Sequence, residues 1–291
     1  GNYLGASFSG DGTFSPSEVD LSSSSLVSSN WTGSSVSGIN AGSGATCAVM
    51  RSGESLCWGK SSESTQSTQT QVTVASPSSG GDVGRNPALS VDSTGNWIIA
   101  FQDEGSISYA TYDGSSWSVE EACPASECDG VGNDLSIGQN GNPHITSYEI
   151  GNEELLHTKL LTNWTSSIAY ASDNPHYTAT AVNQTGGRHV VYYDGSSRDM
   201  MYTHFNRSVW SEPEAIESDS NGNKRFGVSF NDIEVDSLGR PHVSYSYWDR
   251  AANPDVSYLK YAWHNGSEWN ITTLESITQN NAFVYTSLAI D

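Results

Sequence analysis

Basic residues are scarce in this chain. Only 12 of its 291 residues are Lys or Arg, against 33 Asp or Glu, which gives a formal net charge of -21. A surface with this charge repels phosphate backbones, so the sequence argues against nucleic acid as a partner. Long apolar runs are also missing, and none approaches the roughly 20 residues that a membrane-spanning helix needs. We therefore expect no membrane insertion.

Cysteine is rare, and its four copies form two close pairs, Cys47 with Cys57 and Cys123 with Cys128. No His or Cys cluster lies around them at zinc-ligand spacing, which favours disulfides. The alternation in "TCAVMRSGESLCW" predicts a hairpin that places the first pair face to face. Two disulfides imply an oxidising compartment, so we expect a secreted or cell-surface protein. The start at Gly1, with neither Met nor a signal peptide, indicates a processed product or part of a longer protein.

A repeat dominates the rest of the chain. Four segments superpose, namely "LSVDSTGNWIIAF", "LSIGQNGNPHITSY", "TAVNQTGGRHVVYY" and "IEVDSLGRPHVSYS", and each predicts a strand, a glycine turn and a second strand. Each is followed by a third strand, a polar turn and a Trp that opens a fourth strand. Four short strands per unit of about 45 residues are typical of an all-β fold, the β-propeller.

Aromatic residues recur at fixed places in these units. Tyr109, Tyr202 and Tyr261 each lie eight residues before a Trp, which is Trp117, Trp210 or Trp269. One blade cannot bury its apolar face alone, because that face is covered only by the next blade. We interpret the recurrent Tyr and Trp as residues that pack between blades.

The N-terminal part follows another consensus. Ala41-Gly42, Thr46-Cys47-Ala48 and Cys57-Trp58-Gly59 match the "AG..HTCAL" and "CWG" pieces of the regulator of chromosome condensation repeats, with Ala45 in place of the usual His. Residues 1 to 75 thus resemble that family, which also forms propellers. The resemblance implies the fold and transfers no chromatin function.

Residues 84 to 291 resemble a second repeat type, found in microbial surface proteins, with a consensus near "D..G.PHISYYD....LKYA...G..W". The best copy is "VDSLGRPHVSYSYWD" followed by "YLKYAWHNGSEW". This resemblance implies a surface protein and brings no catalytic residues with it.

These patterns predict a single propeller domain, 1 to 291, with about six blades. The predicted blades are 36 to 80, 84 to 125, 130 to 172, 176 to 219, 228 to 278, and a composite of 281 to 291 with 1 to 32. Two alternatives stay open. In the first, the propeller has seven blades. In the second, the C-terminal strand completes the open blade of a neighbouring copy, which gives a head-to-tail polymer.

Two sets of equivalent residues are candidates for a ring of ligands. His144, His189 and His242 each lie three residues after a turn glycine, but Ile98 stands at the fourth equivalent place, which favours packing or backbone hydrogen bonding. Four acids follow the second strands, namely Asp103, Glu149, Asp194 and Asp249. They are candidate ligands for Ca²⁺ or a cationic ligand, against the alternative of solvated loop acids. No other cofactor is expected, and we interpret the "DSTG" and "DSLG" turns as Asx turns.

Six Asn-X-Ser/Thr sequons occur, at Asn30, Asn163, Asn183, Asn206, Asn265 and Asn270. Three of them, Asn163, Asn206 and Asn265, lie in the polar turn just before the Trp of a blade. That turn is expected on the exposed rim, so we predict glycans there.

Motifs for catalysis are missing. "SVDSTGNW" has one residue too many for the Asp-box of a sialidase, and neither a "GxSxG" elbow nor a zincin motif occurs. The sequence therefore predicts no catalytic residues and no enzyme, but an extracellular glycoprotein with a structural or adhesive role, as in a filament. Its partners would be other copies of itself, surface proteins or glycans. The alternative is a carbohydrate-binding lectin or a diverged sialidase-like glycosidase.

Overall fold

The computed structural model describes the backbone of the N-terminal strands and most of the chain after residue 82. The described ranges are 4–8, 14–18, 36–41, 45–50, 55–59, 83–92, 94–113, 116–128, 131–149, 151–171, 174–219, 224–226, 231–252, 254–278 and 286–290. These residues form strands and turns, and none of them forms a helix long and apolar enough to cross a membrane.

Four consecutive antiparallel sheets make up the chain after residue 82. Blade I contains β6 (Val83–Val91), β7 (Trp97–Asp103), β8 (Ser106–Tyr112) and β9 (Trp117–Cys123). Blade II contains β10 (Val131–Ile137), β11 (Pro143–Glu149), β12 (Glu154–Leu160) and β13 (Trp164–Ala171). Blade III contains β14 (Pro175–Val182), β15 (Arg188–Asp194), β16 (Asp199–Phe205) and β17 (Glu214–Glu217). In each sheet the strands pair in sequence order.

Blade IV has a divided first strand. Both β18 (Lys224–Phe226) and β19 (Asp232–Val235) pair with β20 (Pro241–Asp249), which is followed by β21 (Val256–His264) and β22 (Trp269–Ile277). The predicted start of this blade at residue 228 is therefore too late, because β18, in an insertion that the other three blades lack, already pairs with β20.

Two smaller sheets precede blade I. They contain β1 (Leu4–Phe8) with β2 (Phe14–Glu18), and β3 (Val36–Ala41) with β4 (Ala45–Met50) and β5 (Ser55–Gly59). The β4–β5 hairpin is as predicted and places Cys47 opposite Cys57. Their sulfur atoms lie outside the described residues, so this disulfide stays a prediction.

The glycine turns between the first two strands of each blade repeat the same geometry. The Asp92 carboxylate accepts hydrogen bonds from the backbone N–H groups of Thr94 and Asn96, and Asp236 does the same for Leu238 and Arg240. The glycine that precedes the second strand has a positive φ, +90° at Gly95. Both turns are thus Asx turns, as predicted.

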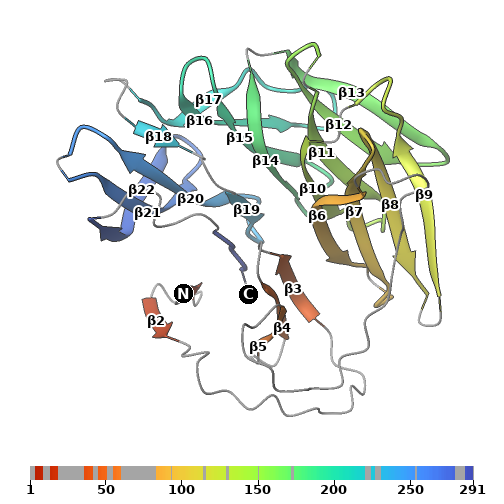
Figure 1. Cartoon of the computed structure of the whole chain (residues 1–291), viewed down its shortest axis with the longest axis horizontal. Coiled ribbons are helices and arrows are strands. Elements are labelled where there is room, and N and C mark those ends of the chain that lie inside the picture. Colours follow the sequence, from red (N-terminus) through yellow and green to blue (C-terminus); the bar gives the residue numbers. More distant parts are fainter. Residues whose placement is uncertain are drawn as a thin grey trace.

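The sheets are arranged around a common centre. The first strands of successive sheets lie against one another, β3 with β6, β6 with β10, β10 with β14, and β14 with β19. Figure 1 shows blades I to IV following one another around the molecule. The fold is a β-propeller, and the predicted fold class is confirmed.

Each hydrophobic core cluster lies between two blades. One joins blades I and II through residues such as Ile107 and Ile145, and another joins blades III and IV through Met200 and Tyr245. A third, smaller cluster joins blades II and III. The predicted packing of aromatic residues between blades is also confirmed, because Tyr109 of blade I contacts Trp164 of blade II.

The C-terminal segment, 286–290, takes the place of the first strand of a further blade. The Leu288 N–H donates to Asp232 Oδ2 at 2.7 Å, just as the Thr180 N–H of blade III donates to Asp134 Oδ2 of blade II at 2.7 Å. The predicted pairing of this segment with residues 1 to 32 falls outside the described residues. Closure by both termini, a seventh blade and completion by a neighbour all stay predictions.

Candidate functional site between blades II and III

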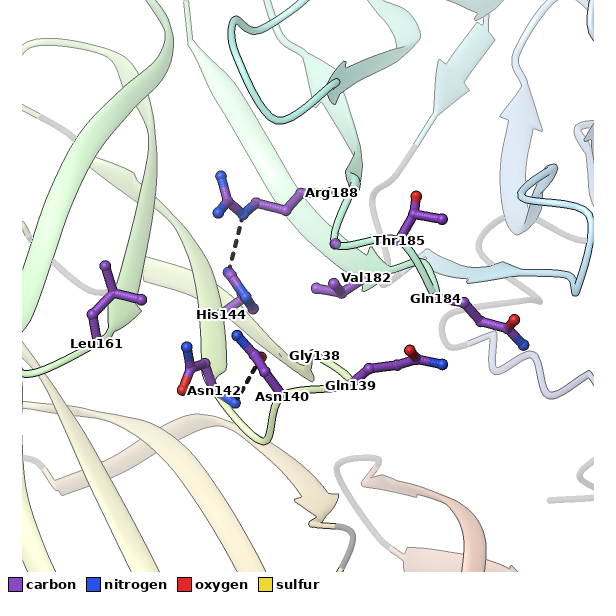
Figure 2. A pocket seen from close by; sticks show the side chains of 11 residues that line it. Gly138, Gln139, Asn140, Asn142, His144, Leu161, Val182, Gln184, Thr185 and Arg188 are labelled. Carbon is purple, nitrogen blue, oxygen red and sulfur yellow. Dashed lines mark hydrogen bonds between the residues drawn. The ribbon is translucent and has the colours of Figure 1, made fainter.

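A hollow of about 240 Å³ lies between blades II and III. Its lining residues are Gly138, Gln139, Asn140, Asn142, His144, Leu161, Val182, Gln184, Thr185, Gly186 and Arg188. Most of them belong to the β10–β11 and β14–β15 turns, which lie at the same end of the two sheets. Figure 2 shows Arg188 reaching across from blade III to His144 of blade II, with Asn140 and Asn142 beside it.

Gly138 lines the hollow and has no side chain. Gly138 takes the place in its turn that Asn183 and Asp236 hold in blades III and IV. The Asn183 side chain lies 3.1 Å from His189 Nε2, and Asp236 Oδ2 lies 3.4 Å from His242 Nε2. A Cβ atom at Gly138 would lie 3.3 Å from His144 Nε2. Without one, Nε2 of His144 faces the hollow.

His144 presents a hydrogen-bond donor to this space. Its Nδ1 accepts a hydrogen bond from Nε of Arg188 at 3.2 Å, and a guanidinium can only donate. Burial, together with the charges of Arg188 and Lys159, lowers the pKa of His144 to about 4. The ring is therefore neutral at neutral pH, and its single proton is on Nε2.

His157 supports His144 from the neighbouring strand. Its Nε2 lies 3.0 Å from His144 Nδ1, and the two rings stack. His157 is buried, and burial, followed by the charges of His144 and Arg188, holds its pKa well below the usual value. Both imidazoles thus stay neutral and fix the orientation of the His144 ring.

Arg188 brings a positive charge that no carboxylate of the described residues balances. Its guanidinium lies over the Phe205 ring, 4.5 Å from the centroid, and in the described part of the chain it forms no ion pair. Arg240 of the next blade is different, because it pairs with Asp236 at 2.6 Å. Burial lowers the pKa of Arg188, but from such a high value that the group stays charged.

The rim of the hollow is rich in amides. Gln139, Asn140, Gln184 and Thr185 are exposed, and Asn142 is half-buried. Amide groups offer both donors and acceptors at short range. Leu161 and Val182 add apolar surface. This combination suits a small polar ligand with several hydroxyl groups and an apolar face.

The three equivalent histidines do not form a shared site. His189 Nδ1 lies 2.6 Å from the Tyr202 hydroxyl and His242 Nδ1 lies 2.5 Å from the Tyr261 hydroxyl, each within its own blade. The hydrogen-bond partner is thus a side chain and not the backbone, and all three rings are buried, as the predicted packing role requires. Among the described residues, no group of three or more His, Cys, Asp or Glu could hold a metal ion.

The four candidate calcium ligands lie at the other end of the blades from the hollow, since they follow the second strand. Glu149, Asp194 and Asp249 accept hydrogen bonds from backbone N–H groups of their own turns, and Asp103 Oδ2 accepts from the Ser108 hydroxyl at 3.3 Å. These contacts match the alternative of loop acids that order their own turns. Calcium binding stays a prediction without support in this geometry.

The sequons differ in how accessible their amide nitrogen atoms are. Asn163, Asn206 and Asn265 are exposed, whereas Asn183 Nδ2 lies against His189 and Asn270 Nδ2 is buried. Asn30 lies outside the described residues.

The predicted disulfide between Cys123 and Cys128 is present, and both residues are buried.

Three carboxyl groups of the first strands were not singled out in the sequence. Burial raises the pKa of Asp134 to about 6 and of Glu234 to about 7, and it raises that of Asp232 well above normal. The charge of Asp134 contributes to both other shifts, so the three groups lie close enough to interact. The sequence did contain a sign of two of them, because Asp134 in "NDL" of blade II and Asp232 in "NDI" of blade IV occupy equivalent places.

Gly138 and Arg188 were also not among the residues predicted from the sequence. Aligning the four turns shows Gly138 where the others have Asp or Asn, and Arg188 where two of the others have Pro. What the alignment does not show is that the two residues meet across a blade boundary.

The chain matches no family model, and no curated protein matches it in sequence. The two named repeat resemblances therefore stay predictions. Among solved structures the chain is similar to a mutant of AofleA from Arthrobotrys oligospora, with a TM-score of 0.53, 12% identity, and coverage of 94% of this chain and 80% of that one. It is also similar to the GH93 alpha-L-arabinofuranosidase of Fusarium graminearum, with a TM-score of 0.48, 10% identity and 68% of each chain covered. The six-bladed Aleuria aurantia lectin gives a TM-score of 0.48, 10% identity, and coverage of 84% and 77%.

At identities this low, the similarity shows the fold alone. It nevertheless corrects the prediction that the chain is not an enzyme, because solved chains of similar fold include glycoside hydrolases. The Asp-box and nucleophile-elbow patterns test only particular enzyme classes, so their absence from the sequence excludes no other class.

Proposed function

We propose that this protein is an extracellular carbohydrate-binding propeller and that the hollow between blades II and III holds a single sugar residue. This is the alternative that the sequence left open, and no finding supports the structural or adhesive role. The observation that carries the proposal is the hollow itself, where amide side chains, the Nε2 donor of His144 and the Arg188 guanidinium surround one small space.

The size of the hollow sets the size of the ligand. At about 240 Å³ it is smaller than the roughly 300–1,000 Å³ of pockets for drug-sized ligands, which suits one pyranose ring. Sugar hydroxyls both donate and accept hydrogen bonds, and side-chain amides can likewise accept from them and donate to them. The buried disulfide between Cys123 and Cys128 supports an oxidising, extracellular location.

A glycan array tests this proposal, with isothermal titration calorimetry of the sugars that bind. Asn142→Ala removes a rim amide and is expected to weaken binding about tenfold, whereas Leu238→Ala, at an exposed turn of blade IV, is the matched surface control. No binding to any glycan by the correctly folded, full-length chain would contradict the proposal.

Glycoside hydrolysis is a second candidate, and the carboxyl groups of the first strands favour it. Glycosidases of most families use two carboxyl groups, one of them an acid whose pKa is raised. Glu234 has a pKa of about 7 and interacts with Asp134. Asp134 and Asp232 already accept backbone N–H groups across blade boundaries, which leaves Glu234 as the better proton donor.

A panel of chromogenic glycosides tests hydrolysis. Any turnover should fall at least a hundredfold in Glu234→Gln, which keeps the shape of the side chain but cannot supply a proton. Turnover that persists unchanged in this variant would remove Glu234 from the reaction. Binding without turnover of any glycoside would leave carbohydrate recognition as the function.

A further inference from the structure

The hollow carries the positive charge of Arg188, although the net charge of the protein is -21. Besides Arg188, Lys159 lies on the strand next to His144, and the charge of each lowers the pKa of His144. Neither cation forms an ion pair with a carboxylate in the described part of the chain. None of the residues that line the hollow is an acid.

Blade IV has a carboxylate in its glycine turn that blades II and III lack. There the turn residue is Asp236, which neutralises Arg240 and lies next to His242. In blade II the equivalent residue is Gly138, and in blade III it is Asn183. The two turns that border the hollow therefore lack the carboxylate that blade IV provides for its own arginine.

The groups that face the hollow from its inner side are donors. Arg188 uses Nε on His144, which leaves its two terminal nitrogen atoms for other partners, and His144 has its proton on Nε2. A guanidinium binds a planar oxyanion through two parallel hydrogen bonds. The half-buried position of Arg188 over Phe205 makes such a contact stronger than one on the open surface.

From this geometry we infer that the hollow selects a sugar residue that bears a negative charge, with the Arg188 guanidinium binding the oxyanion and His144 Nε2 donating to another oxygen of the same residue. This inference rests on the proposed function and narrows its ligand to acidic sugars. The carboxylate of a uronic acid and a sulfate ester are two sources of such a negatively charged group.

The test compares sugars that differ only at one position. We expect the full-length chain to bind glucuronic acid or glucose 6-sulfate at least tenfold more tightly than glucose, as measured by isothermal titration calorimetry. Affinity for the carboxylate and not the sulfate, or the reverse, identifies the source of the charge. In Arg188→Gln the preference for the acidic sugar should fall to about one, because the charge-assisted hydrogen bonds are lost. Arg240→Gln, in a turn outside the hollow, should keep the preference.

A second pair of variants tests the charge without removing Arg188. Gly138→Asp recreates the arrangement of blade IV and supplies a carboxylate next to His144, whereas Gly138→Asn has nearly the same shape without the charge. The acidic sugar should bind at least tenfold more weakly to the Asp variant than to the Asn variant. Circular dichroism and thermal unfolding confirm that both variants fold.

The outcomes separate the inference from the function on which it rests. If glucose binds as tightly as glucuronic acid and Arg188→Gln changes nothing, the inference is overturned while carbohydrate binding stands. If no saccharide binds to the folded protein, both fail.

Discussion

Trp164 of blade II lies edge-on against Tyr109 of blade I, with ring centroids 5.0 Å apart, and its indole N–H donates to Glu120 Oε1 of blade I at 3.1 Å. Trp269 repeats this arrangement against Tyr202 and Glu214 of blade III. Blades II and IV thus make the same aromatic contact and the same hydrogen bond with the blade before them, whereas Trp210 of blade III lies against His157 of blade II.

This contact should contribute measurably to stability. We expect Trp164→Ala to lower the free energy of unfolding by about 2–3 kcal/mol, because it removes a half-buried indole, an aromatic contact and a hydrogen bond to a carboxylate. Trp164→Phe keeps a ring and should cost about 1 kcal/mol. Urea unfolding followed by circular dichroism measures both. The exposed Leu238→Ala is the control, and an equal loss in that variant would contradict the assignment.

Glu234 should make stability depend on pH. Its pKa in the folded protein, about 7, exceeds the ordinary value near 4.5, so the protonated carboxyl favours the folded state. Its contribution is complete below pH 4.5 and is lost as the pH rises through 7. Glu234→Gln should therefore match the wild type at pH 5 and be more stable by on the order of 2 kcal/mol at pH 8.

Urea unfolding at both pH values measures this difference. Buried histidines such as His144 and His189, whose pKa values are lowered to about 4, oppose the trend in both proteins and so cancel in the comparison. A constant difference between variant and wild type from pH 5 to pH 8 would show that Glu234 titrates normally.

All four cysteines should be oxidised in the native protein. Alkylation under denaturing, non-reducing conditions, followed by intact mass spectrometry, should add no label, and peptide mapping should pair Cys47 with Cys57. Replacing Cys123 and Cys128 by Ser should cost about 2 kcal/mol, since the closed loop is short. A labelled Cys47 would remove the predicted second disulfide.

Glycans are expected at Asn163, Asn206 and Asn265 but not at Asn183 or Asn270. The first three are exposed, whereas the amide nitrogen of Asn183 lies against His189 and that of Asn270 is buried. Enzymatic deglycosylation in heavy-oxygen water and peptide mass spectrometry measures occupancy at each site. Glycosylation of Asn183 on protein made in a eukaryotic host would show that its turn opens before the blade is complete.

Local patterns in the sequence were enough to predict the blades. The glycine turns, the Asx residues and the Tyr-to-Trp spacing each depend on neighbours within one unit, and the same unit recurs four times. Repetition makes each pattern easier to recognise than it would be in a single copy. The divided first strand of blade IV was harder, because an insertion has no counterpart in the other blades.

By itself the sequence determined the all-β repeat, the packing role of Tyr109 and Trp164, and the pairing of Cys123 with Cys128, since these follow from spacing along the chain. Only the tertiary structure brought Arg188 to His144, placed Gly138 beside them and buried Asp134 and Glu234. These residues belong to different blades, and the pKa of a carboxyl or the charge of a hollow depends on what is close in space rather than in sequence.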